Sequence, residues 1–190
     1  VWLVTLPALL FGTLGGTPIF GLPDGFRALT NGNVAGVPNP VIAVAVLATL
    51  AWVILNKSPL GEYFMAVGGN PDAARIAGVP VTLTKLSAYM ISGLMAAVAA
   101  LILIGRLGAA EPTLGTLWEL DAIAAAAIGG ASLMGGRGSI VGTLIGAIIL
   151  GTLRNGLTLM NVQAFYQLLA TGIIIIVAML IDKLTSGKQG

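Results

Sequence analysis

The sequence of 190 residues is too apolar and too poor in charge for a soluble globular domain. Hydrophobic residues make up 57% of it and charged residues 8%, whereas soluble domains carry about 25% charged residues. We therefore expect an all-α polytopic transmembrane bundle of about five to six spans. The sequence has no His and no Cys. This excludes disulfides, and it excludes catalytic triads and metal sites that use those residues. We expect no cofactor and no metal. The net charge of +2 gives no indication of a nucleic acid partner.

Long stretches without charge predict the membrane spans in chain order. The first stretch, 1–23, is interrupted by Pro and Gly residues. It begins without Met inside an apolar run, so we expect that an N-terminal part of the protein precedes it. Helical spans are expected over 39–56, 86–105, 118–136, 138–154 and 164–181. Most Lys and Arg residues lie on the side of the membrane that the loop 57–85 occupies, which predicts a cytoplasmic loop and a cytoplasmic C-terminus.

Two interpretations fit the short apolar runs 122–136 and 138–153. Each run has about 15 residues, roughly 23 Å as a helix, which is short for a full span. The runs form either two tilted spans or a re-entrant hairpin that enters and leaves by one face. We favour two spans, because a hairpin would leave Arg137 at membrane depth, which costs at least a few kcal/mol without a partner or water. Both interpretations leave the C-terminus on the same side.

Small residues at helical spacing predict close helix packing in the same region. The residues recur every four positions in two rows, the first with Gly138, Gly142 and Gly146 and the second with Ala147 and Gly151. Such rows let a second helix approach closely. We expect them to pack helices within the bundle rather than to act directly in transport.

The loop 57–85 contains the signals of a short helix at both of its ends. Asn70 is a capping residue, Pro71 occupies the first helical position, and Asp72 lies in the first turn. Residues that favour a helix follow, namely Ala73, Ala74 and Arg75, and Gly78 then ends it. A helix of about two turns is too short to be stable alone. We therefore expect it to dock onto a partner or onto its own bundle.

Acidic and basic residues avoid the middle of the expected spans. Glu119 and Asp121 lie outside the membrane or near its interface. They lie where the dipole of a helix N-terminus would stabilise a pair of negative charges. A carrier coupled to ions or protons needs intramembrane charge, so this class is poorly supported. A transporter of another class needs a different energy source, which an external ATPase acting on a cytoplasmic helix would supply. A self-contained channel or carrier and a non-transporting scaffold are the alternatives.

Several strings resemble bacterial ATP-binding-cassette (ABC) importer permeases. Asp72-Ala73-Ala74-x-x-x-Gly78 is similar to the Glu-Ala-Ala-x-x-x-Gly loop of those permeases, with Asp in place of Glu. Wider strings resemble the ribose-type permease family, which also includes permeases for xylose, galactose, inositol and autoinducer-2. These strings lie at 68–79, 119–125, 129–133, 135–139, 142–147, 155–157 and 166–167. Branched-chain amino-acid permeases are a related alternative, and the string 119–123 favours the sugar branch.

This resemblance implies the permease subunit of an ABC importer for a monosaccharide such as ribose, with autoinducer-2 or branched-chain amino acids as alternatives. It implies that the chain lies in the bacterial cytoplasmic (inner) membrane, in contact with membrane lipid. It also implies three partners: an ABC ATPase subunit on the cytoplasmic side, a second permease subunit and a periplasmic substrate-binding protein. The chain is then not an enzyme, because the ATPase subunit hydrolyses ATP. Family members have close to twice as many spans, so residues 1–190 are expected to be one N-terminally truncated permease domain.

The resemblance assigns ATPase coupling to the short cytoplasmic helix, which in the family sits in a groove of the ATPase. The residues that correspond to this helix are Asn70, Asp72, Ala73, Ala74, Arg75 and Gly78. For Glu119 and Asp121 the resemblance implies a contact with the binding protein or a role at the pore mouth, and the alternative is the charge pair at a helix N-terminus. No single residue is assigned to the sugar. The aromatic and amide side chains available for it are Trp118, Asn155, Asn161, Gln163, Phe165 and Tyr166.

Overall fold

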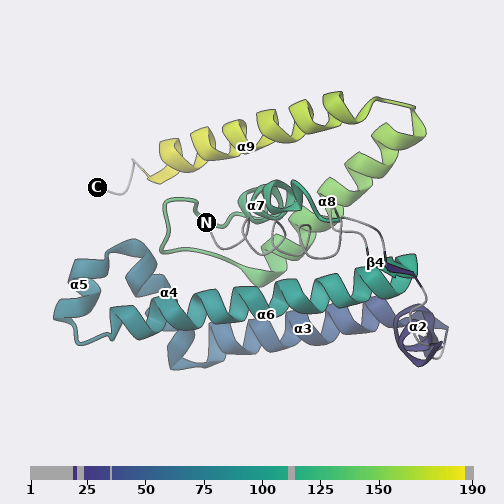
Figure 1. Cartoon of the computed structure of the whole chain (residues 1–190). Helices are drawn as coiled ribbons and strands as arrows, with labels where there is room; N and C mark the ends of the chain where they lie inside the picture. Colours follow the sequence, from purple (N-terminus) through teal and green to yellow (C-terminus); the bar gives the residue numbers. More distant parts are fainter. Residues whose placement is uncertain (1–18, 21–23, 35, 111–113, 187–190) are drawn as a thin grey trace. The chain divides into compact units, whose positions relative to one another are not determined.

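The computed structural model describes residues 19–20, 24–34, 36–110 and 114–186, and these residues are mainly helical (Figure 1). They contain eight helices, α2–α9, and four strands of two residues each. The expected all-α membrane fold is therefore confirmed. Most of the apolar stretch 1–23 lies outside the described residues.

Three helices of the described chain are long and apolar enough to cross a membrane: α3 (Asn39–Lys57), α6 (Val81–Leu107) and α8 (Ile140–Leu159). A further helix, α9 (Ala164–Ser186), is apolar over Ala164–Leu180. These helices lie where four of the spans were expected. The helix α6 begins at Val81 rather than at 86, because a stretch without charge marks only the apolar part of a helix, and Lys85 lies within α6. The Thr84 Oγ1 donates to the Pro80 carbonyl at 3.0 Å in this first turn.

The chain divides into two compact units, 1–47 with 90–116 and 48–89 with 117–190. In the first unit two pairs of short strands are antiparallel. They are β1 (Ile19–Phe20) with β4 (Ala109–Ala110), and β2 (Asn33–Val34) with β3 (Val37–Pro38).

The helix α2 (Asp24–Asn31) packs against the last turn of α6 in this first unit. The buried side chain of Thr30 fills the space that a Cβ on Gly105 would need. Asn31 adds a hydrogen bond from its Nδ2 to the Gly105 carbonyl, at 3.1 Å. Glycine at this position of α6 therefore allows the two helices to touch.

The second unit contains α4 (Pro59–Gly69), α5 (Pro71–Ile76), α7 (Trp118–Ile128), α8 and α9 (Figure 1). The helix α4 was not predicted, since its region was read as part of a polar loop. Its sequence is nevertheless apolar enough to pack, and Val67 is buried in it. Pro59 stands at its first turn, where the missing N–H costs nothing.

The expected helix over 118–136 is wrong in its second half, because α7 ends at Ile128. Eleven residues rise about 16 Å, half of a hydrocarbon thickness. Gly130 closes the helix in the left-handed conformation (φ +80°): its N–H donates to the Ala127 carbonyl at 3.0 Å, and the Ala131 N–H donates to the Ala126 carbonyl at 2.9 Å. Residues 129–139 are non-helical and connect α7 to α8.

Candidate functional site

The short helix α5 has the cap at its start that the sequence predicts. The side-chain Oδ1 of Asn70 accepts hydrogen bonds from the N–H groups of Asp72 and Ala73, both at 3.0 Å. Pro71 stands at the first helical position. These contacts satisfy backbone donors that would otherwise lack a partner, and they define where the helix begins.

The C-terminal end of α5 is equally well defined. Gly78 adopts φ +84°, a conformation that favours glycine, and donates its N–H to the Arg75 carbonyl at 3.0 Å. The N–H of Val79 donates to the Ala74 carbonyl, also at 3.0 Å. This pair of hydrogen bonds is the Schellman arrangement, which closes a helix and turns the chain away from its axis.

Ala74 fixes α5 to the rest of the second unit. Its side chain is 4% exposed and packs with Val67 of α4, Val81 at the start of α6, and Val79. The helix is thus held by one small buried residue rather than by a broad face. The rest of its surface remains available to a partner.

Ile76 is the large apolar side chain on that available surface. It is 89% exposed, and the neighbouring residues Asp72, Ala73 and Arg75 are also exposed. The sequence interpretation did not single out Ile76. A signal was present, because Ile76 is the one large apolar residue between Asn70 and Gly78.

The predicted glycine rows divide into two kinds of position. A Cβ on Gly146 would overlap the backbone of α7 at the Ala125 carbonyl, and a Cβ on Gly142 would overlap the carbonyl of Gly129, the residue that directly follows α7. These two glycines therefore let α8 pack backbone to backbone on α7. In contrast, Gly138 precedes α8, and apart from chain neighbours and the backbone of its own helix no described heavy atom lies within 4 Å of the Cβ position on Gly151.

A cavity of about 520 Å³ lies among α7, α8 and α9 in the second unit. Most of its lining is apolar, and its polar or aromatic side chains are Trp118, Asp121, Arg154, Gln167 and Thr171. Gln167 is oriented by a hydrogen bond from its Nε2 to the Val162 carbonyl, at 3.0 Å. The Thr171 Oγ1 donates to the Gln167 carbonyl, also at 3.0 Å.

Asp121 and Arg154 form an ion pair at this cavity. Asp121 lies in the first turn of α7, and Arg154 lies near the end of α8. Their contact, together with that of Gly129 and Gly142 at the other ends of the helices, shows that α7 and α8 run antiparallel. The side chains of Asp121 and Arg154 are 25% and 37% exposed, so water partly screens the attraction.

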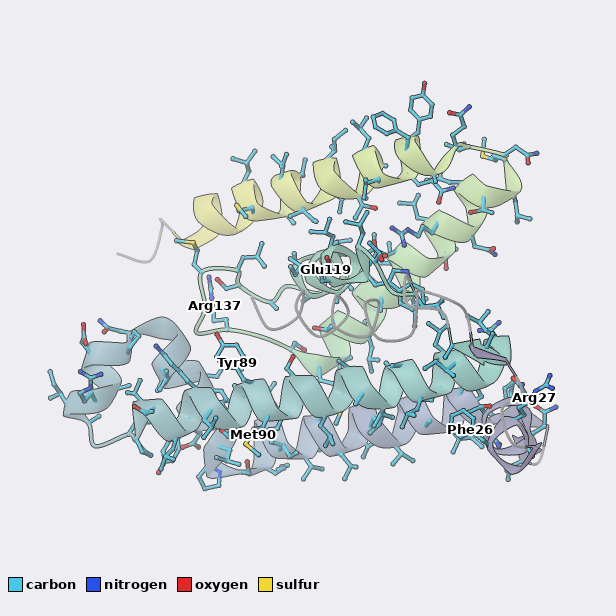
Figure 2. All side chains as sticks on the ribbon, in the orientation of Figure 1. Phe26, Arg27, Tyr89, Met90, Glu119 and Arg137 are labelled. Atoms are coloured by element: carbon cyan, nitrogen blue, oxygen red, sulfur yellow. The ribbon has the colours of Figure 1, made fainter. Side chains whose placement is uncertain are left out.

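The other predicted residues lie outside this cavity. Glu119 is exposed at the start of α7 (Figure 2). Phe165 and Tyr166 are exposed, and their rings meet edge to face with centroids 6.0 Å apart. Asn161 adopts φ +56° and closes α8, donating its N–H to the Thr158 carbonyl at 3.0 Å. Of the predicted aromatic and amide candidates for a sugar, the structure places Trp118 at the cavity.

Arg137 lies in the loop between α7 and α8 (Figure 2), and its side chain is exposed. Its carbonyl accepts the Ser132 N–H at 2.9 Å, which folds residues 132–137 into a compact turn. Among the described residues, no three Asp or Glu side chains gather as ligands for a metal ion.

The sequence profile of the family described as "Branched-chain amino acid transport system / permease component" matches residues 3–179. The chain is 49% identical over 170 residues to the ribose import permease protein RbsC of Bacillus subtilis, covering 88% of this chain and 53% of that protein. It is 42% identical to RbsC of Haemophilus influenzae, with 87% and 51% covered. Identity to the xylose transport system permease protein XylH of Escherichia coli is 44%, with 81% and 39% covered. The chain thus spans about half the length of these curated relatives, or less, and no solved structure matches it.

Proposed function

The chain belongs to the family of branched-chain amino acid transport system permease components, and we propose that it forms part of the membrane pathway of an ABC importer for a monosaccharide such as ribose. The 49% identity to a ribose import permease over 88% of the chain carries this proposal. The 44% identity to a xylose permease supports the same class of substrate, because ribose and xylose are both pentoses. Autoinducer-2 and branched-chain amino acids are the alternative substrates.

The proposal includes three partners and a location. An ABC ATPase subunit binds on the cytoplasmic side and hydrolyses ATP, so this chain itself is not an enzyme. A second permease subunit completes the pathway, and a periplasmic binding protein delivers the sugar. The chain lies in the bacterial inner membrane with its C-terminus in the cytoplasm, which the distribution of Lys and Arg supports.

Within this importer, α5 is the contact for the ATPase. Three features support the assignment: the helix is capped at both ends, it is held to its own unit through Ala74, and it presents the exposed apolar side chain of Ile76. A single exposed apolar side chain is common on protein surfaces, so Ile76 supports an interface only together with the capped and anchored helix that carries it. The predicted coupling residues Asp72, Ala73 and Arg75 are exposed in the same short helix.

Uptake of radiolabelled ribose tests the proposed function. Cells would express the protein from its complete gene, together with an ABC ATPase and a periplasmic binding protein from the same organism. We expect saturable uptake that excess unlabelled ribose competes and leucine does not. Competition by leucine instead would place the protein in the amino-acid branch, and full uptake after deletion of the ATPase gene would indicate a self-contained channel or carrier.

A further inference from the structure

Three glycines bring the end of α4 into backbone contact with the loop between α7 and α8. We call this the glycine contact, formed by Gly68 on α4 and by Gly135 and Gly136 in the loop. A Cβ built on Gly68 would lie 2.7 Å from the backbone N of Gly136, and one on Gly136 would lie 2.9 Å from the Cα of Gly69. Because a side chain would not fit at either place, the two backbones meet directly.

The glycine contact joins α5 to the α7–α8 pair. On one side, α4 passes through the single residue Asn70 into α5, and the Asn70 N–H donates to the Ala66 carbonyl at 3.0 Å. On the other side, the loop continues into α8, which packs backbone to backbone on α7 at Gly142 and Gly146. Close-packed backbone passes on a displacement without side-chain rotamers that could absorb it.

We infer that the glycine contact transmits movement of α5 to α7 and α8, so that Gly68 and Gly136 are positioning residues for transport. This inference rests on the proposed function, in which an ATPase moves α5. The α7–α8 pair carries the cavity and the Asp121–Arg154 ion pair at its far end. A movement of the loop would therefore move α7 and α8, and with them the polar groups at the cavity.

A pair of alanine substitutions separates the contact from its surroundings. Gly68→Ala places a methyl group against the Gly136 backbone at 2.7 Å, whereas Gly69→Ala places one at 3.8 Å from the Gly136 Cα, an ordinary contact. Both residues lie in α4, where Ala is the better helix former. Any loss of ribose uptake per ATP that occurs in Gly68→Ala and not in Gly69→Ala must therefore arise at the glycine contact.

The measurement is ribose uptake per ATP hydrolysed, in vesicles that hold the protein from its complete gene with its ATPase and binding protein. For Gly68→Ala we expect a fall of about tenfold from the forced separation, with the ATPase still co-purifying in the wild-type amount. For Gly69→Ala we expect wild-type coupling. If Gly68→Ala and Gly69→Ala import the same amount of ribose per ATP hydrolysed, while the wild type is coupled, the inference is overturned and the proposed function stands. No ATP-dependent uptake by the wild type would overturn the proposed function and the inference with it.

A cross-link provides a second test that does not depend on how Gly68→Ala folds. The 190 residues contain no Cys, and the Met65 Cε lies 3.9 Å from the Cβ position on Gly138. Met65→Cys with Gly138→Cys, joined by a short thiol-reactive linker, would fix α4 to the loop beside the glycine contact. We expect uptake to survive this cross-link, because the two parts move together. Loss of uptake on cross-linking, restored when a cleavable linker is cut, would overturn the inference.

Discussion

Removal of the Asn70 cap tests whether α5 is an independently formed helix held by local contacts. In Asn70→Ala, the N–H groups of Asp72 and Ala73 lose the acceptor that lies 3.0 Å from each. Loss of such a cap costs about 1 kcal/mol, which raises the population of the opened helix about fivefold. The fraying should extend along the whole helix, because α5 has only six residues.

Hydrogen–deuterium exchange of a peptide that covers 70–79 measures this opening. In Asn70→Ala we expect the backbone amides of Ala77 and Val79, which are hydrogen-bonded within α5 and its closing turn, to exchange about fivefold faster. Asn70→Asp is the matched control, because Asp caps a helix as well as Asn does, and exchange should stay at the wild-type rate. Equal rates in wild type and Asn70→Ala would refute the reasoning that this cap holds α5.

Three further substitutions test the packing and the proposed interface. Gly146→Ala should destabilise the protein by about 1–3 kcal/mol, because its Cβ would overlap the backbone of α7, and the melting temperature of the purified protein should fall accordingly. Gly151→Ala should leave the melting temperature unchanged. Arg154→Gln should cost about 0.5–1 kcal/mol because the ion pair with Asp121 is partly exposed; a double-mutant cycle that shows no coupling would contradict this. Ile76→Asp should weaken ATPase co-purification without changing the melting temperature, and an unchanged yield of ATPase would argue against the α5 interface.

The sequence predicts α5 well because its signals are local. A capping amide, a proline at the first helical position and a glycine at the closing turn each act within a few residues, and Asn70, Pro71 and Gly78 have those roles in the structure. The end of α7 was predicted wrongly, because there a local signal was present but was given too little weight. Apolar composition continues through 118–136, and it outweighed the closing signal of Gly130, which the structure shows to be decisive.

The contacts between helices were beyond the reach of the sequence pattern. Asp121 and Arg154 are 33 residues apart, and they meet only because α7 and α8 pack antiparallel. Likewise, spacing alone placed Gly142 and Gly151 in similar rows, but only tertiary packing shows that one meets the backbone directly after α7 and the other faces open space among the described residues. The family resemblance is confirmed by the profile match over residues 3–179, because it rests on many strings rather than on one motif.

The most direct test of the proposed importer is the energy requirement for sugar accumulation. The protein from its complete gene would be placed in lipid vesicles with its ATPase and ribose-loaded binding protein, and internal ribose would be measured with ATP and with ADP. We predict that ribose accumulates above its external concentration with ATP only, and that Ile76→Asp lowers the accumulation. Equilibration of ribose through the protein in vesicles without any ATPase would contradict an ATP-driven pathway.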